Sequence, residues 1–213
     1  MTMRFLDLLL NTAAAAGELH PKVRRLNQRT ERVGKDIAYT ASKNRAHQLD
    51  VYRPRNTQGM LPVVFFVHGG GFRILSKDSH RALARRFADA GYVVVTINYR
   101  LTPEGAYPHA LMDVCKALLW TLDHAQDFGG DASRLIYAGE SAGGNLTLAA
   151  TVAGCYAPSE PWAQAVFERN PSPSVVLPAC GAADGAVPGA AAACASTPGF
   201  AQDAVVLTGI RVK

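Results

Sequence analysis

Cysteine is scarce in this sequence, and its four copies lie far apart. Cys115, Cys155, Cys180 and Cys194 form no C-x-x-C pair, and the six histidines do not cluster. Zinc sites and disulfide frameworks need such spacings, so the sequence predicts neither of them. Widely spaced thiols fit a reducing compartment, and we therefore expect a cytoplasmic protein with no metal.

Long apolar runs are also absent. No stretch approaches the roughly 18 consecutive apolar residues that a membrane span requires. The N-terminal segment MTMRFLDLLLNTAAAAGELH superficially resembles a secretion signal, but Asp7 and Asn11 interrupt its apolar part and Arg4 is its only early arginine or lysine. We interpret it as an amphipathic helix, and we expect no stable membrane insertion.

The net charge of +5 does not indicate a nucleic-acid partner. Its basic residues cluster in PKVRRLNQRTERVGK and HRALARR, without interleaved aromatic residues or a nucleic-acid motif, as on a solvated helix face. Nucleotide binding is disfavoured too. The segment GGGFRI breaks the G-x-G-x-x-G pattern, and the pair Gly34-Lys35 has no glycine five positions upstream.

The order of apolar segments predicts one α/β domain. Alternation in 36–42 and 47–54 indicates two short antiparallel strands, whereas the continuous apolar runs 61–67, 92–99 and 134–138 are typical of strands buried on both faces. Helical spacing follows each of these runs, and PSVVLPACG adds a possible further strand. This alternation predicts a mostly parallel sheet with right-handed crossovers and helices on both faces.

One serine lies at the turn between a predicted strand and a predicted helix. In YAGESAGGNL, Ser141 has Gly139 and Gly143 on either side, and these small residues permit a strained, sharp turn. Such a turn leaves the hydroxyl exposed at the edge of the sheet, as a nucleophile requires. Because a G-x-S-x-G match arises by chance in about one chain in fifteen of this length, the motif alone is weak.

A second motif, HGGGF at residues 68–72, follows another buried strand. Consecutive glycines leave backbone N–H groups free to point inward together, which builds a cradle for a developing oxyanion. Chance yields H-G-G-G in roughly one chain in several hundred. Two unrelated tight turns remain the alternative explanation of the pair of motifs.

The segments HGGGF, NYRLTPE, YPHALMDV and GGDASRLIYAGESAGGN occur in this order, and residues 35–180 resemble the hormone-sensitive-lipase-like carboxylesterases and lipases of the α/β-hydrolase superfamily. The resemblance implies a three-layer α/β-hydrolase sandwich that acts on small-molecule esters without a cofactor. It makes Ser141 the nucleophile, assigns the oxyanion hole to the N–H groups of Gly70, Gly71 and Ala142, and gives His68 and Gly69 a supporting part in the glycine loop.

The same resemblance gives structural parts to several further polar residues. We expect Glu140 to make a structural hydrogen bond, and we expect Tyr99, Arg100 and Glu104 to fix a turn through buried polar contacts. The histidines on predicted helices, His80, His109 and His124, are interpreted as satisfied surface or capping residues.

The triad of this fold runs serine, acid, histidine along the chain, but no histidine follows Ser141, and neither Asp184 nor Asp203 is a convincing acid. We therefore expect a truncated or frameshifted esterase that lacks its C-terminal strands. Its parts would be a helical lid segment (1–45), the hydrolase core (46–181) and a tail rich in Ala, Gly and Pro (182–213). A shortened, non-catalytic module that binds a small ligand or a partner is the alternative.

Overall fold

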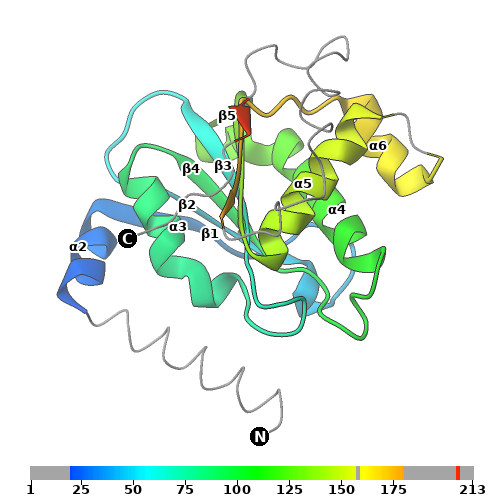
Figure 1. Ribbon diagram of the computed structural model, residues 1–213. Coiled ribbons are helices and arrows are strands. Elements are labelled where there is room, and N and C mark those ends of the chain that lie inside the picture. Colours follow the sequence, from blue (N-terminus) through cyan, green and yellow to red (C-terminus); the bar gives the residue numbers. More distant parts are fainter. Residues whose placement is uncertain (1–19, 157–158, 180–204, 207–213) are drawn as a thin grey trace, which may run out of the picture.

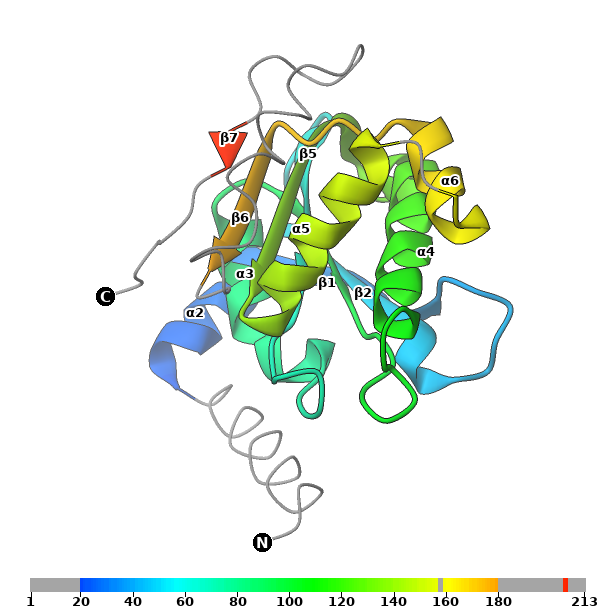
Figure 2. The ribbon, with the colours of Figure 1, turned by 45° about the vertical axis from the view of Figure 1, so that its right-hand side comes forward.

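The computed structural model describes residues 20–156, 159–179 and 205–206, and it has three layers. A twisted sheet forms the middle layer, as Figures 1 and 2 show. Helix α3 (Arg81–Asp89) covers one face, helices α4 (His109–His124) and α5 (Ala142–Cys155) cover the other, and helix α6 (Pro161–Arg169) packs against α4 and α5. The predicted α/β sandwich is confirmed.

The sheet has the strand order β1-β2-β4-β3-β5-β6-β7 among the described residues. Strands β3 (Leu61–Val67), β4 (Val93–Ile97), β5 (Gly130–Glu140) and β6 (Val175–Ala179) run parallel. The antiparallel hairpin β1 (Thr30–Ala38) and β2 (Gln48–Pro54) continues the sheet from β4. At the other edge, β7 (Val205–Val206) pairs with β6 inside the segment that the sequence left unplaced.

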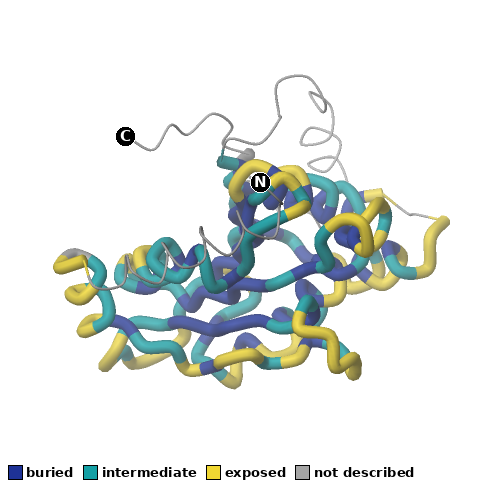
Figure 3. The backbone as a smooth tube through the Cα atoms, turned by 90° about the horizontal axis from the view of Figure 1, so that it is seen from below, coloured by how far each residue is buried: buried dark blue, intermediate teal, exposed yellow. Residues whose placement is uncertain are grey.

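Strand β3 buries both of its faces because each face has its own helix layer. Val63, Phe65 and Val67 face the core under α4 and α5, whereas Val64 and Phe66 face the core under α3. Such a strand needs apolar residues at every position, which explains the absence of alternation in its sequence. The buried strands lie at the centre of Figure 3, and the exposed segments lie around them.

Two glycines end helical segments. Gly91 (φ 100°) follows α3 and donates its N–H to Ala88 O at 2.9 Å. Gly129 (φ 78°) ends η3 (Ala125–Phe128), which continues α4. A left-handed conformation after the last turn favours glycine, since it carries no Cβ.

The N-terminal segment differs from the expected helical lid. Among its described residues, α2 (Pro21–Arg29) is the only α-helix, Arg45 begins the short 3-10 helix η1 (Arg45–His47), and Thr30–Ala38 is a strand of the main sheet. Arg29 Nε lies 2.8 Å from Asp89 Oδ1, just before β4 begins, which places α2 at the amino ends of the parallel strands. Ser141 follows the carboxyl end of β5, so α2 does not cover it. Residues 1–19 lie outside the described residues.

The cysteines also differ in part from the expectation. Cys115 is a free and buried thiol, whose pKa burial raises to about 12, whereas Cys155 is disulfide-bonded. The predicted absence of disulfide pairing is therefore wrong at Cys155. Cys180 and Cys194 lie outside the described residues. In the described part of the chain, none of the helices has both the length and the apolar character of a membrane span.

Candidate active site

Ser141 occupies a sharp turn between β5 and α5. Its backbone angles are φ 50° and ψ −114°, a conformation that costs a residue with a side chain roughly 1 to 3 kcal/mol, and the residue is exposed. The predicted strain and exposure are both confirmed. The surroundings hold the turn in place: Ser141 donates its N–H to Ala179 O at 2.8 Å, and Asn145 N–H bonds Ser141 O at 3.0 Å.

The two glycines of the motif allow this turn to pack against the sheet. A Cβ at Gly143 would lie 2.1 Å from Val67 O, and a Cβ at Gly139 would lie 2.5 Å from the carbonyl of Gly143. Only hydrogen fits at either position. The first turn of α5 therefore lies directly against the end of β3.

The glycine loop leaves the sheet beside this turn because β3 and β5 are neighbouring parallel strands, with Val67 opposite Gly139. Gly70 (φ 113°) and Gly71 (φ 59°) have left-handed backbones. A Cβ at Gly70 would lie 2.0 Å from Ile74 O, and a Cβ at Gly69 would lie 2.8 Å from Glu140 O. Each of these features requires glycine.

A helix N-terminus and a glycine loop therefore meet at Ser141. Helix α5 begins at Ala142, and the unpaired N–H groups of a first helical turn attract negative charge. Gly71 is exposed beside it. An anion that forms next to the Ser141 hydroxyl would have N–H donors of the loop and of the helix within its surroundings.

His68 lies behind the glycine loop and is fully buried. Its Nδ1 lies 2.7 Å from Gly69 O, its ring stacks on Tyr99 with centroids 4.4 Å apart, and Tyr99 Oη donates to His68 O at 3.0 Å. Burial lowers the pKa of the His68 imidazole to about 3, so the ring is neutral at neutral pH. Nδ1 then carries the proton, because Gly69 O can only accept. These contacts hold the loop rather than a substrate.

In the segment NYRLTPE, buried polar contacts were expected for Tyr99, Arg100 and Glu104, and the first two residues make them. Tyr99 bonds His68, and Arg100 forms a bidentate pair with the fully buried Asp113, with Nε–Oδ2 at 2.8 Å and Nη2–Oδ1 at 2.7 Å. The Asp113 carboxylate raises the pKa of the Arg100 guanidinium above its already high value. Glu104 is exposed, so the expectation of a buried contact is wrong for it.

Two further residues lie at the junction of loop and turn. Glu140, immediately before Ser141, accepts a hydrogen bond from His80 Nε2 at 3.0 Å, as expected of a structural carboxylate. His80 occupies the N-cap position of α3, as its interpretation as a capping histidine implies, but it is buried, with 9% of its surface exposed, so a surface histidine is wrong. His124, by contrast, is partly exposed and pairs with Asp127.

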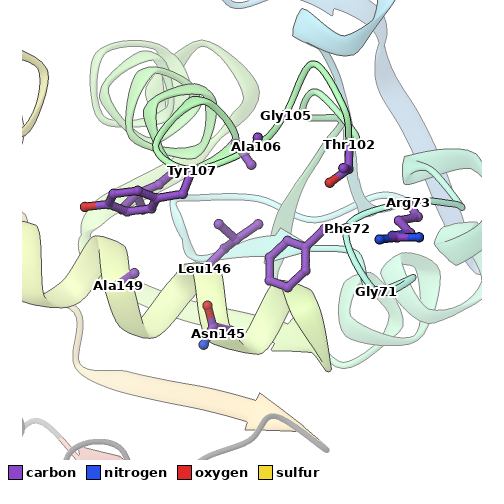
Figure 4. Close-up of a pocket in the computed structure, with 12 residues that line it drawn as sticks. Gly71, Phe72, Arg73, Thr102, Gly105, Ala106, Tyr107, Asn145, Leu146 and Ala149 are labelled. Atoms are coloured by element: carbon purple, nitrogen blue, oxygen red, sulfur yellow. The ribbon is translucent and has the colours of Figure 1, made fainter.

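An apolar cavity of about 440 Å³ begins beside the glycine loop and extends along α5. Figure 4 shows Phe72 and Leu146 next to each other in it, with Tyr107 further along and Arg73 near Gly71. Sequence reasoning missed these lining residues, since their positions depend on how the loops fold over α5. No group of His, Cys, Asp and Glu suited to holding a metal occurs within the described ranges.

The comparisons with known proteins agree with this geometry. A family described as having the α/β hydrolase fold matches residues 64–167, which include the glycine loop and the Ser141 turn. This chain has an α/β-hydrolase fold. A thermostable esterase from Pseudomonas putida superposes on this chain with a TM-score of 0.64 at 28% identity, over 84% of this chain and 51% of its own.

Several curated relatives of this chain are named as esterases or carboxylic ester hydrolases. Carboxylesterase NlhH from Mycobacterium tuberculosis is 44% identical over 98 residues, which are 46% of this chain and 31% of that protein. The protein named "Probable carboxylic ester hydrolase LipM" of the same organism is 34% identical over 63% of this chain and 31% of its own length. The matched part thus spans about a third of these relatives.

Proposed function

We propose that this hydrolase domain belongs to an esterase in which Ser141 Oγ attacks the acyl carbon of a carboxylic ester. The N–H groups of Gly70, Gly71 and Ala142 would hold the oxyanion. One observation carries the proposal: β3 and β5 are neighbours in parallel register, so the glycine loop and the strained serine emerge at the same end of the sheet. The named activities of the relatives support it.

In the proposed reaction, a bond forms between Ser141 Oγ and the acyl carbon, the hydroxyl proton passes to a base, and the alcohol leaves with a proton. Water then cleaves the acyl-enzyme. The sequence supplies no histidine after Ser141 for the usual base. The interpretation as a truncated or frameshifted form without the triad acid and base stays a prediction. Resequencing the coding DNA around residues 165–185 tests it.

The cavity supports small, uncharged esters as substrates. Phe72, Leu146 and Ala149 line it, and its one charged side chain, Arg73, is exposed. An apolar acyl or alcohol group would lose water there at a gain of about 25 cal/mol per Å². No cofactor takes part in the proposed reaction, and a cytoplasmic location stays a prediction that cell fractionation tests.

A fluorophosphonate probe tests the nucleophile directly. Ser141 Oγ forms a bond to phosphorus, fluoride leaves, and the proton goes to solvent. We expect weak, slow labelling of Ser141 by intact-mass measurement, because no histidine follows Ser141 to activate its hydroxyl, and no labelling of Ser141→Ala. Hydrolysis of p-nitrophenyl acetate should stay near background, because loss of the histidine base typically costs on the order of a million-fold. Equal labelling of both proteins would refute the assignment.

In the printed sequence no histidine follows Ser141, and this observation favours one second candidate: a non-catalytic hydrolase-like module that binds a small ligand or a partner in the same cleft. It predicts no labelling of Ser141 at any probe concentration and apolar ligand binding that Ser141→Ala leaves unchanged. Isothermal titration calorimetry measures such binding without any turnover.

A further inference from the structure

The contact between His80 and Glu140 joins two segments that lie far apart in the sequence. His80 ends η2 (Lys77–His80), which follows the glycine loop, and Glu140 is the last residue of β5. His80 Nε2 lies 3.0 Å from Glu140 Oε2. The hydrogen bond therefore links the loop half of the proposed oxyanion hole to the half that begins at Ser141.

His80 is held in place before it meets the carboxylate. Its Nδ1 lies 2.9 Å from Ser79 Oγ and 3.3 Å from Ser76 O, and its ring packs against those of Phe66 and His68 with centroids 5.7 and 5.8 Å apart. A bond between two mobile surface groups is worth little, since ordering both side chains costs entropy. Here one partner is 9% exposed and already ordered, and only Glu140, at 49%, has to be fixed.

The backbone next to Glu140 makes its contact with His80 important for the geometry of the site. Glu140 directly precedes Ser141, whose conformation is strained, and Gly69 approaches Glu140 O so closely that a Cβ there would be 2.8 Å away. A shift of Glu140 therefore moves the serine and the glycine loop relative to each other. Displacements of about 1 Å at such a site can cost a hundredfold in rate.

We propose that His80 and Glu140 form a positioning pair, which fixes the N–H donors of Gly70 and Gly71 relative to Ser141 and Ala142. The proposal rests on the proposed function, because it assigns the pair to the oxyanion hole. Neither side chain touches the reacting atoms: the pair acts through the backbone of the loop and of the turn.

The test compares phosphonylation rates of Ser141 in the full chain. His80→Asn and Glu140→Ala should each slow labelling by about tenfold, a fraction of the hundredfold or more that loss of an oxyanion donor costs. Their double variant should be no slower than the slower single variant, because the two residues act as one unit. Glu140→Gln keeps an oxygen that accepts from His80 Nε2, so it should stay within about twofold of wild type.

A matched control is His124→Asn, which removes an exposed histidine paired with Asp127 at 3.2 Å and far from the turn. It should label like wild type. Three results would each overturn the positioning pair. The control variant could slow labelling to the same extent, or the effects of the two single variants could add in the double variant. The third is a labelling rate of Glu140→Gln as low as that of Glu140→Ala.

If the probe does not label the wild type, that result contradicts the proposed function but not the positioning pair. Hydrogen exchange of the backbone amides then tests the pair. Amides of residues 69–76 and 141–145 should exchange about fivefold faster in His80→Asn, while those of α4 remain unchanged. Uniform acceleration across the sheet would show a general loss of stability instead, and unchanged exchange at both segments would likewise refute the pair.

Discussion

Replacing Gly143 with alanine should destabilise the protein strongly, although Gly→Ala within a helix usually stabilises. The new Cβ would lie 2.1 Å from Val67 O, 2.6 Å from His68 O and 2.7 Å from Val67 C, where ordinary contacts begin near 3.4 Å. All three atoms belong to the backbone of β3 or its first loop residue, so no side chain can rotate away. Helix α5 would have to move outward by about 1 Å.

The expected cost is about 3 kcal/mol, at the upper end for overpacking in a dense interior. With a urea m-value of about 2 kcal/mol/M, the unfolding midpoint should fall by about 1.5 M. Gly154→Ala is the matched control in the same helix. Its Cβ would meet nothing closer than Pro171 at 3.5 Å, so it should raise stability by about 0.5 to 1 kcal/mol.

Urea titration followed by tryptophan fluorescence measures both variants against wild type. Opposite shifts of the two midpoints are the expected result. A Gly143→Ala midpoint within about 0.2 M of wild type would refute the argument, because it would mean that α5 and β3 separate at little cost.

Three further predictions concern buried charge. Lys77→Met should lower the free energy of unfolding by about 1 to 3 kcal/mol in urea titration, since it removes the Nζ that lies 2.8 Å from the fully buried Asp50 carboxylate, which then keeps the Arg32 guanidinium at 3.1 Å; a neutral effect would contradict this. Arg100→Lys should cost about 1 kcal/mol in thermal melts, because lysine cannot form both bonds to Asp113, and an unchanged melt would argue against their value. The pKa of His68 is about 3 in the folded state, against 6.5 for the free side chain. Between these pH values the unfolded chain binds one proton more than the folded chain. The stability of the wild type therefore falls as the pH drops from about 6.5 toward 3. His68→Gln should reduce the slope of unfolding free energy against pH by the amount that corresponds to at most one proton. Identical slopes for the variant and the wild type would refute this prediction.

Backbone requirements are the part of the site that sequence reasoning predicted well. Ser141 is strained and exposed, and Gly139 and Gly143 leave no room for a Cβ, because a sharp turn packed against a strand admits few residue types. The buried strands were recognisable for a similar reason, since helices on both faces leave no position for polar side chains. In both cases the steric or burial requirement is local, so consecutive residues of the sequence reveal it.

Contacts between distant segments were not predictable in this way. His80 and Glu140 are 60 residues apart, and no local pattern distinguishes His80 from the exposed His124. The sequence analysis did not predict helix α6. It also did not predict that a strand begins at Thr30, because this part of β1 is rich in basic residues, which an edge strand beside the antiparallel β2 tolerates. Only the arrangement of the sheet reveals these relations.

The insertion of β4 and α4 between the two motifs has a consequence for synthesis of the chain. The HGGGF loop lies beside Ser141 in space, where a Cβ at Gly69 would be 3.5 Å from Ser141 Cβ, yet His68 and Ser141 are 73 positions apart in the sequence. At about 5 to 20 residues per second, the ribosome delivers the serine roughly 4 to 15 s after the glycine loop. During that interval, β3 has β4 as a partner on one side only, and its other edge must await β5. A nascent chain that is paused between the two motifs therefore presents that edge to chaperones or to neighbouring chains.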